Sequence, residues 1–224
     1  MMRFALACTV VLGSLSSVSH ADRATAPPHH FAQPPGAVAA TQPDQGELEL
    51  VLDRDHIRAA LTTERAHNIA AFEAYVRRGS FPSNTFTTNI ANVWRDRDGH
   101  LCAAATMIDA SGAHALVKQV AEQNNFIRLA DVKQGPLMDW MLTSGLTQDE
   151  VALIQRPFMP VENPTAPTTV AQDKRTTETA RLNALYAQIE KTLAANERAS
   201  LDAATERLMK HQQLAWSLLA SMPS

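Results

Sequence analysis

The sequence has few of the features that usually identify a function. It contains two cysteines in 224 residues, and Cys8 lies in the N-terminal apolar run. The other, Cys102, cannot form an internal disulfide by itself, so stability has to come from burial of apolar side chains. Lysine and arginine (20) do not outnumber aspartate and glutamate (23), and the pI is about 6.2. This balance argues against a nucleic-acid-binding protein.

Signature motifs of enzymes and metal sites are also missing. We find no H-E-x-x-H, no paired-cysteine zinc spacing, no glycine-rich phosphate loop and no G-x-S-x-G. The run "DRDG" at 96–99 begins like a calcium loop, but "HLC" follows it and supplies no further oxygen ligands, so a tight turn closing on Gly99 explains it better. His29 and His30 in a proline-rich leader make a weak metal site. The sequence predicts no cofactor and no metal.

The N-terminus predicts export. One arginine precedes an apolar run of about a dozen residues, and Ser19, His20 and Ala21 then form a small-x-small cleavage site. We expect cleavage after Ala21. The run is shorter than the roughly 20 residues of a membrane-spanning helix, and no later segment is apolar enough to span. The expected product is a periplasmic or secreted protein without a membrane span.

Composition divides the rest of the chain into four parts. Residues 22–46 are rich in proline, alanine and glutamine and predict a disordered leader, and a second proline-rich stretch predicts a linker over 161–171. A folded domain is expected over 47–160, which holds eight of the twelve aromatic residues. Residues 172–222 form a predicted amphipathic helical region.

The pattern within 47–160 predicts a mainly α fold. Apolar residues recur at helical spacing across 53–79, as one helix or as two with a break near Thr62 and Thr63. Thr147 and Glu150 form a T-x-x-E capping box at the start of a later helix. The segment 80–96 is rich in threonine, asparagine and aromatics and is broken by Pro82, so it predicts a loop that leads into a short strand near 90–95, within a strand or hairpin over 88–101. Further helices are expected within 102–112, 113–125, 135–145 and 146–157.

The C-terminal region is predicted to be one long helix or a helical hairpin. Its leucines recur in steps of three and four, thin out at "AANERAS" and resume out of register, so a strict heptad is missing. Two interpretations stay open: an amphipathic helix packed on the core, and a self-associating coiled coil. Either way, 172–222 is the candidate surface for a protein partner or for self-association. The polar face mixes both charge signs and does not indicate membrane binding around Trp216.

Cys102 is the candidate catalytic residue. It lies at the predicted start of a helix, where a thiol pKa is lowered, and His100 or His114 could serve as the base, with Asp131 or Asp109 to orient it. None of these spacings is diagnostic, because such partners meet in space. The alternative is a buried core cysteine, which the small residues of "LCAAATMI" favour.

Three motifs of the domain resemble a family of exported bacterial proteins. They are Tyr75-x-x-x-Gly79-x-Phe81-Pro82-x-Asn84, then Asp96-x-x-Gly99-x-x-Cys102-Ala103, and Glu150-x-x-x-Ile154-Gln155. The family carries no assigned function, so the resemblance implies a compact domain and export, and no activity. Family members often carry a histidine directly before the cysteine, whereas this chain has Leu101 there and His100 one residue earlier.

The sequence therefore leaves three functional hypotheses. The first is an exported, non-enzymatic binding or structural module of the cell envelope. The second is a cysteine-dependent hydrolase that uses Cys102. The third is a periplasmic chaperone-like helical protein, which no sequence feature separates from the first.

Overall fold

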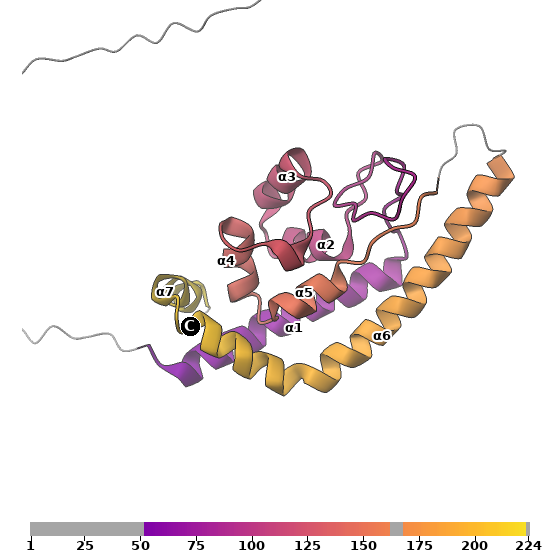
Figure 1. The fold of residues 1–224 in the computed structure, drawn as a ribbon. Helices are drawn as coiled ribbons and strands as arrows, with labels where there is room; N and C mark the ends of the chain where they lie inside the picture. Colours follow the sequence, from indigo (N-terminus) through magenta and orange to yellow (C-terminus); the bar gives the residue numbers. More distant parts are fainter. Residues whose placement is uncertain (1–51, 162–167, 223–224) are drawn as a thin grey trace, which may run out of the picture. The chain divides into compact units, whose positions relative to one another are not determined.

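The structure is a computed structural model that describes residues 52–161 and 168–222. The predicted signal peptide (1–21), the leader (22–46) and most of the linker (161–171) lie outside these residues. Seven α-helices and one short 3-10 helix make up the described part (Figure 1). They are α1 (Arg54–Arg78), α2 (Ala103–Ala110), α3 (His114–Gln123), η1 (Leu129–Asp131), α4 (Pro136–Thr143), α5 (Gln148–Ile154), α6 (Thr168–Leu208) and α7 (Gln212–Ser221).

The predicted mainly α fold is confirmed. Helix α1 runs without a break through Thr62 and Thr63, so the one-helix alternative is the right one. Asp53 caps its start by accepting a hydrogen bond from the Asp55 N–H, and Gly79 ends it in the left-handed conformation with φ of 63°. Two arginines in the last turn interact favourably with the negative end of the helix dipole.

Helices α1 and α6 form an antiparallel pair. Arg54 and Arg58 near the start of α1 bond to Glu206 and Asp202 near the end of α6. At the other end of the pair, Tyr186 of α6 makes edge-on ring contacts with α1, at 5.5 Å from Phe72 and 5.7 Å from Tyr75 between ring centroids. The pairing therefore extends along the whole of α1.

Most of the remaining helices pack against this pair, whereas α3 packs on α2 and η1 on α5. Helix α2 lies against α1, and α4, α5 and α7 contact α6. The buried apolar residues form one cluster that draws on 57–158 and on 182–218 alike. The C-terminal helices thus share a core with the segment predicted as a domain over 47–160. This sharing follows from Leu182, Tyr186, Ile189 and Leu193, which present one apolar stripe to α1.

The predicted strand within 88–101 is not formed. The described residues contain isolated bridges instead, Ala91 with Phe158 and Arg95 with Leu101 among them. Side-chain amides take the place of a strand ladder: Asn125 both accepts from the N–H and donates to the C=O of Arg95. The threonines, asparagines and aromatics of 80–96 predicted the strand, but the backbone there bonds to side-chain amides, one of them 30 residues away. The tight turn at Gly99 is present, with the Gly99 N–H donating to Asp96 O.

The long C-terminal helix is confirmed. Helix α6 has 41 residues, passes through "AANERAS" without interruption and begins at Thr168, four residues earlier than predicted. Figure 1 shows that α6 is bent and that its last part turns toward α7. Among the described helices, none is both long enough and apolar enough to cross a membrane.

Candidate functional site

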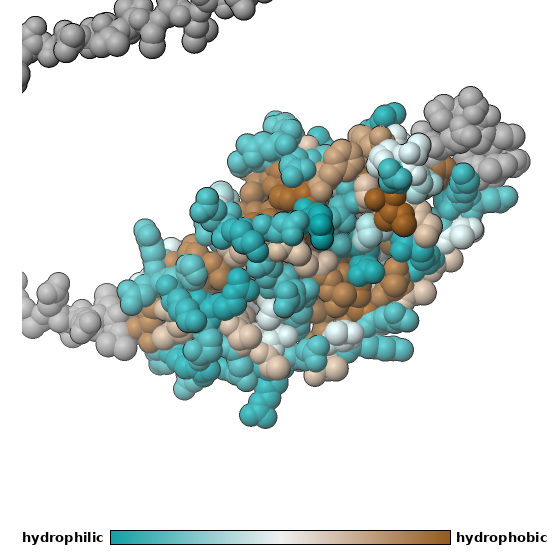
Figure 2. All heavy atoms as spheres, in the orientation of Figure 1, coloured by the Kyte–Doolittle hydropathy of each residue, from teal (hydrophilic) through white to brown (hydrophobic). Residues whose placement is uncertain are grey.

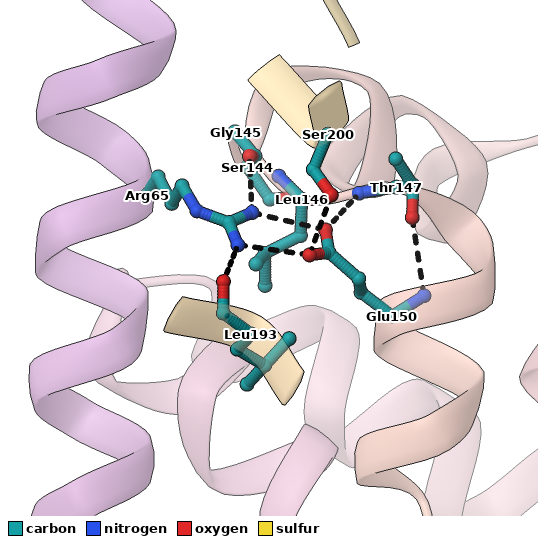
Figure 3. A network of polar contacts seen from close by, with 8 residues as sticks. All are labelled: Arg65, Ser144, Gly145, Leu146, Thr147, Glu150, Leu193 and Ser200. Carbon is teal, nitrogen blue, oxygen red and sulfur yellow. Dashed lines mark hydrogen bonds and ion pairs between the residues drawn. The ribbon is translucent and has the colours of Figure 1, made fainter. Parts of the chain in front are cut away.

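A buried polar network joins helices α1, α5 and α6 (Figure 3). Arg65 of α1 donates from Nη1 to Glu150 Oε2 at 2.9 Å and from Nη2 to Glu150 Oε1 at 2.8 Å. The same guanidinium donates to Gly145 O at 3.1 Å and to Leu193 O of α6 at 2.9 Å. Both side chains are more than nine-tenths buried. Four acceptors therefore fix the orientation of Arg65.

Glu150 is equally well satisfied. Its oxygens also accept from the Thr147 N–H and from the Ser200 hydroxyl of α6, and the Glu150 N–H donates to Thr147 Oγ1. This is the predicted capping box, now joined to two other helices. Burial alone would raise the pKa of Glu150, but the hydrogen bonds from Arg65, Thr147 and Ser200 hold that pKa below its ordinary value.

The network anchors α6 on the rest of the protein. Beside it, the surfaces of α1 and α6 separate and leave a groove between the two helices. The groove has a volume of about 360 Å³, and its walls come from 62–73 of α1 and 190–197 of α6. Small side chains create the space, because Ala66, Ala70 and Ala194 line it where larger residues would fill it. Figure 2 shows an apolar surface in this region between the two helices.

The groove has an apolar floor and an acidic rim. Half-buried Ile69 and the three alanines form the accessible apolar surface, and the buried Phe72 and Leu193 lie beneath it. Glu73, Glu190 and Glu197 stand at the sides. Arg65 is the one basic residue that lines the groove, and its charge is already paired with Glu150. The groove therefore combines a place for apolar side chains with an excess of negative charge.

The structure places Cys102 in the core. The residue is the N-cap of α2, as its predicted position at a helix start requires, and its sulfur accepts from the Ala105 N–H at 3.5 Å. Only 1% of it is exposed, and burial raises the pKa of the thiol to about 12 despite the lowering effect of nearby N–H groups. At neutral pH the thiol is protonated, which opposes nucleophilic use.

The predicted partners of Cys102 do not meet it. His100 Nδ1 lies 3.0 Å from Asp96 Oδ2, and His114 Nδ1 lies 2.7 Å from Asp109 Oδ1 in an exposed pair. Asp131 is exposed beside Arg128. Throughout 52–161 and 168–222, no hydrogen bond joins Cys102 to an imidazole or a carboxylate. The four residues predicted for catalysis thus occupy separate places.

Asp96, Asp98 and His100 bring potential metal-ligand atoms within 4.8 Å of one another. The buried carboxylate of Asp96 is occupied, however, since it accepts from the backbone N–H groups of Ser83, Asp98 and His100 and from the His100 ring. Burial would raise the pKa of Asp96, but these donors lower it. Asp96 therefore organises the 96–100 turn.

Sequence reasoning found Glu150 through its capping box but missed Arg65 and Ser200. Arg65 lies on the buried face of α1 with Leu61, Asn68 and Phe72. An arginine at a position where the helical spacing predicts an apolar residue was the signal that could have indicated a buried ion pair. Ser200 sits in the segment where the leucine stripe thins, which is where α6 binds Glu150 through a hydroxyl. The groove was not predictable from the sequence, because it forms only where two helices that are distant in sequence pack together.

Comparison with known proteins gives no relative: no family model, no curated protein and no solved structure matches the chain.

Proposed function

We propose that the protein is an exported, non-enzymatic binding module of the cell envelope, and that it binds an amphipathic helical segment of a protein partner in the groove between α1 and α6. The observation that carries the proposal is the apolar groove with its rim of Glu73, Glu190 and Glu197. Helices commonly bind by laying an apolar face into such a groove.

Charge selects the kind of segment. Three glutamates at the sides favour a helix with lysine or arginine next to its apolar face, because opposite charges raise the association rate and suppress wrong partners. The buried Arg65–Glu150 pair holds the two walls in place, so the groove is preformed. A preformed site loses less conformational freedom on binding.

The test uses a labelled 18-residue helical peptide of leucine and lysine, with its leucine–glutamate counterpart as the charge control. We expect the protein to bind the basic peptide more tightly in fluorescence anisotropy. Ala194→Trp should block the groove, and exchange of all three rim glutamates for glutamine should weaken binding. Ala184→Trp is the matched control, since Ala184 is an exposed alanine of α6 outside the groove.

Two results would overturn the proposal. Equal loss of binding in Ala184→Trp and Ala194→Trp would place the site elsewhere. Equal binding of both peptides, together with suppression of client aggregation, would favour the chaperone-like function instead. Export has its own measurement: the N-terminus of the protein isolated from cells should be Asp22, and an intact Met1 would contradict the predicted cleavage.

A further inference from the structure

A second surface lies on the loops, away from the groove. Four large apolar side chains are exposed there: Phe86 (38%), Ile90 (58%), Phe126 (44%) and Met159 (42%). We call these four residues the loop surface. In the described part of the chain, Trp216 of α7 is the one other large apolar residue exposed to this degree. The exposed apolar residues are thus concentrated on three loops.

The four residues form two neighbouring pairs. The Phe86 and Phe126 rings pack edge to face with centroids 5.6 Å apart. Ile90 and Met159 line one surface pocket, next to the bridge between Ala91 and Phe158. Phe86 and Ile90 share the short loop over 84–91, which connects the two pairs. In Figure 2, apolar side chains lie over this loop region, beside α3.

Buried amides hold these loops in fixed positions. Asn84 is fully buried, and its Nδ2 donates to Asn89 O at 2.8 Å and to Phe158 O at 3.1 Å, which closes the loop that carries Phe86 and Ile90. Gln155 accepts from the Leu129 N–H and donates to Ile127 O, which holds the loop of Phe126. Because these hydrogen bonds fix the loops, the apolar side chains of the loop surface stay exposed to solvent.

One arginine lies over the phenylalanine pair, and two more lie in the adjoining segments. The Arg97 guanidinium carbon lies 5.3 Å from the centroid of the Phe86 ring, a cation–π contact. Arg95 and Arg128 are also exposed, on the 95–97 and 126–128 segments. Arg128 has a loose ion pair with Asp131 at 3.6 Å, and within the described residues Arg95 and Arg97 have none. The exposed acids beside these segments are Asp98 and Asp131, and the pocket of Ile90 and Met159 adds one exposed acid, Asp173, and one exposed base, Lys174. The arginines therefore leave a small excess of positive charge around the loop surface on an acidic protein.

We propose that the loop surface docks on an anionic lipid bilayer. Phenylalanine, isoleucine and methionine would enter the boundary between headgroups and acyl chains, while the arginines bind lipid phosphates. The size of the surface favours lipid over a protein partner. Four partly exposed side chains are far fewer than the roughly 20–30 residues that each partner contributes to a standard protein interface. A few buried apolar groups, aided by arginines near an anionic surface, suffice for reversible membrane docking.

The test is flotation with vesicles, using the chain from Asp22 onward, which retains every described residue and lacks the apolar N-terminal run. Vesicles contain phosphatidylcholine alone or with added phosphatidylglycerol. We expect the protein to float with the anionic vesicles and not with the neutral ones. Exchange of Phe86 and Phe126 for serine should lower the partition coefficient about tenfold or more, as should exchange of Ile90 and Met159 for serine. Arg95→Gln with Arg97→Gln should weaken binding and reduce its dependence on salt.

The matched control is Trp216→Ser, which removes an exposed apolar side chain of α7 and should leave partition unchanged. All exchanged residues are exposed, and thermal unfolding of each variant verifies its fold. Absence of flotation with anionic vesicles would overturn the proposal, as would equal losses in the loop variants and in Trp216→Ser. Variants that keep vesicle binding but lose a specific envelope protein would also overturn it, in favour of a protein interface. The groove variant Ala194→Trp should still float, which separates this test from that of the proposed function.

Discussion

Arg65 of α1 and Glu150 of α5 form a two-pronged buried ion pair across 85 residues of sequence. Each side chain also bonds to α6, Arg65 through Leu193 O and Glu150 through the Ser200 hydroxyl. The pair is therefore the place where the position of α6 on the rest of the protein is determined. Burial of two charges is costly, and here every charged atom has partners that offset the cost.

Removal of either partner should strongly destabilise the protein. We expect Glu150→Gln or Arg65→Met to lower the free energy of unfolding by about 3–5 kcal/mol, because each leaves an unpaired charge in the core. The double variant should cost less than the sum of the two single variants. Urea unfolding followed by circular dichroism measures this cycle.

The exposed pair Arg54–Glu206, which also joins α1 to α6, is the control. Glu206→Gln should change the free energy of unfolding by about 1 kcal/mol or less. If Glu150→Gln fails to fold, Ser200→Ala still tests the network, with an expected loss of about 1 kcal/mol. Similar losses at Glu150 and Glu206 would show that the buried network does not determine stability.

Acid should lower the free energy of unfolding by protonating the carboxylates of Glu150 and Asp96. Folding lowers the pKa of both Glu150 and Asp96 from their ordinary values of 4.5 and 3.8. A lowered folded-state pKa contributes stability that is complete above the unfolded pKa and is lost as pH falls through the folded one. Unfolding free energy should therefore decline below about pH 4.5. Urea midpoints between pH 2 and 7 should decline less steeply in Asp96→Asn and Glu150→Gln, and an unchanged slope would exclude these groups as the cause.

The helices were predictable because each has local signals. The spacing of Ile57, Leu61 and Phe72 defined α1, and Gly79 and the Thr147–Glu150 capping box located a helix end and a helix start. The loops between Gly79 and Cys102 were less predictable. Their backbone bonds go to Asn84, Asp96 and Asn125 side chains, and a sequence pattern does not show such pairings.

The motifs that suggested a family resemblance have structural roles. Asn84 and Gln155 hold loops, Asp96 organises a turn, and Glu150 pairs with Arg65. The groove and the loop surface lie mainly on residues outside these motifs. Alanines and exposed apolar residues have no chemical signature in a sequence, and only the packing of distant helices and loops brings them together.

Gly145 marks a close approach between the turn before α5 and helix α1. Its φ is +73°, and a Cβ there would overlap Leu61 O and lie 2.7 Å from Arg65 Cβ. Gly145→Ala should combine left-handed strain with a backbone clash and cost about 2–5 kcal/mol. Gly112 also has a positive φ, of +87°, but open space around its Cβ position, so Gly112→Ala should cost only about 1–2 kcal/mol. Equal melting temperatures for the two variants would contradict the close approach.

The accessibility of Cys102 decides between its two interpretations. The thiol is buried, caps α2 and has a pKa raised to about 12 by burial, so alkylation of the folded protein should stay slow from pH 5 to 9. Denaturant should release the residue and restore the rate of an ordinary thiol, whose pKa is about 8.5. The unfolded chain at each pH supplies the reference rate, and His100→Gln and His114→Gln test whether either imidazole affects labelling. Fast labelling of the folded protein below pH 8 that depends on one of these histidines would restore the hydrolase hypothesis. Slow labelling that follows the unfolding equilibrium, with both histidine variants unchanged, would assign Cys102 to the core.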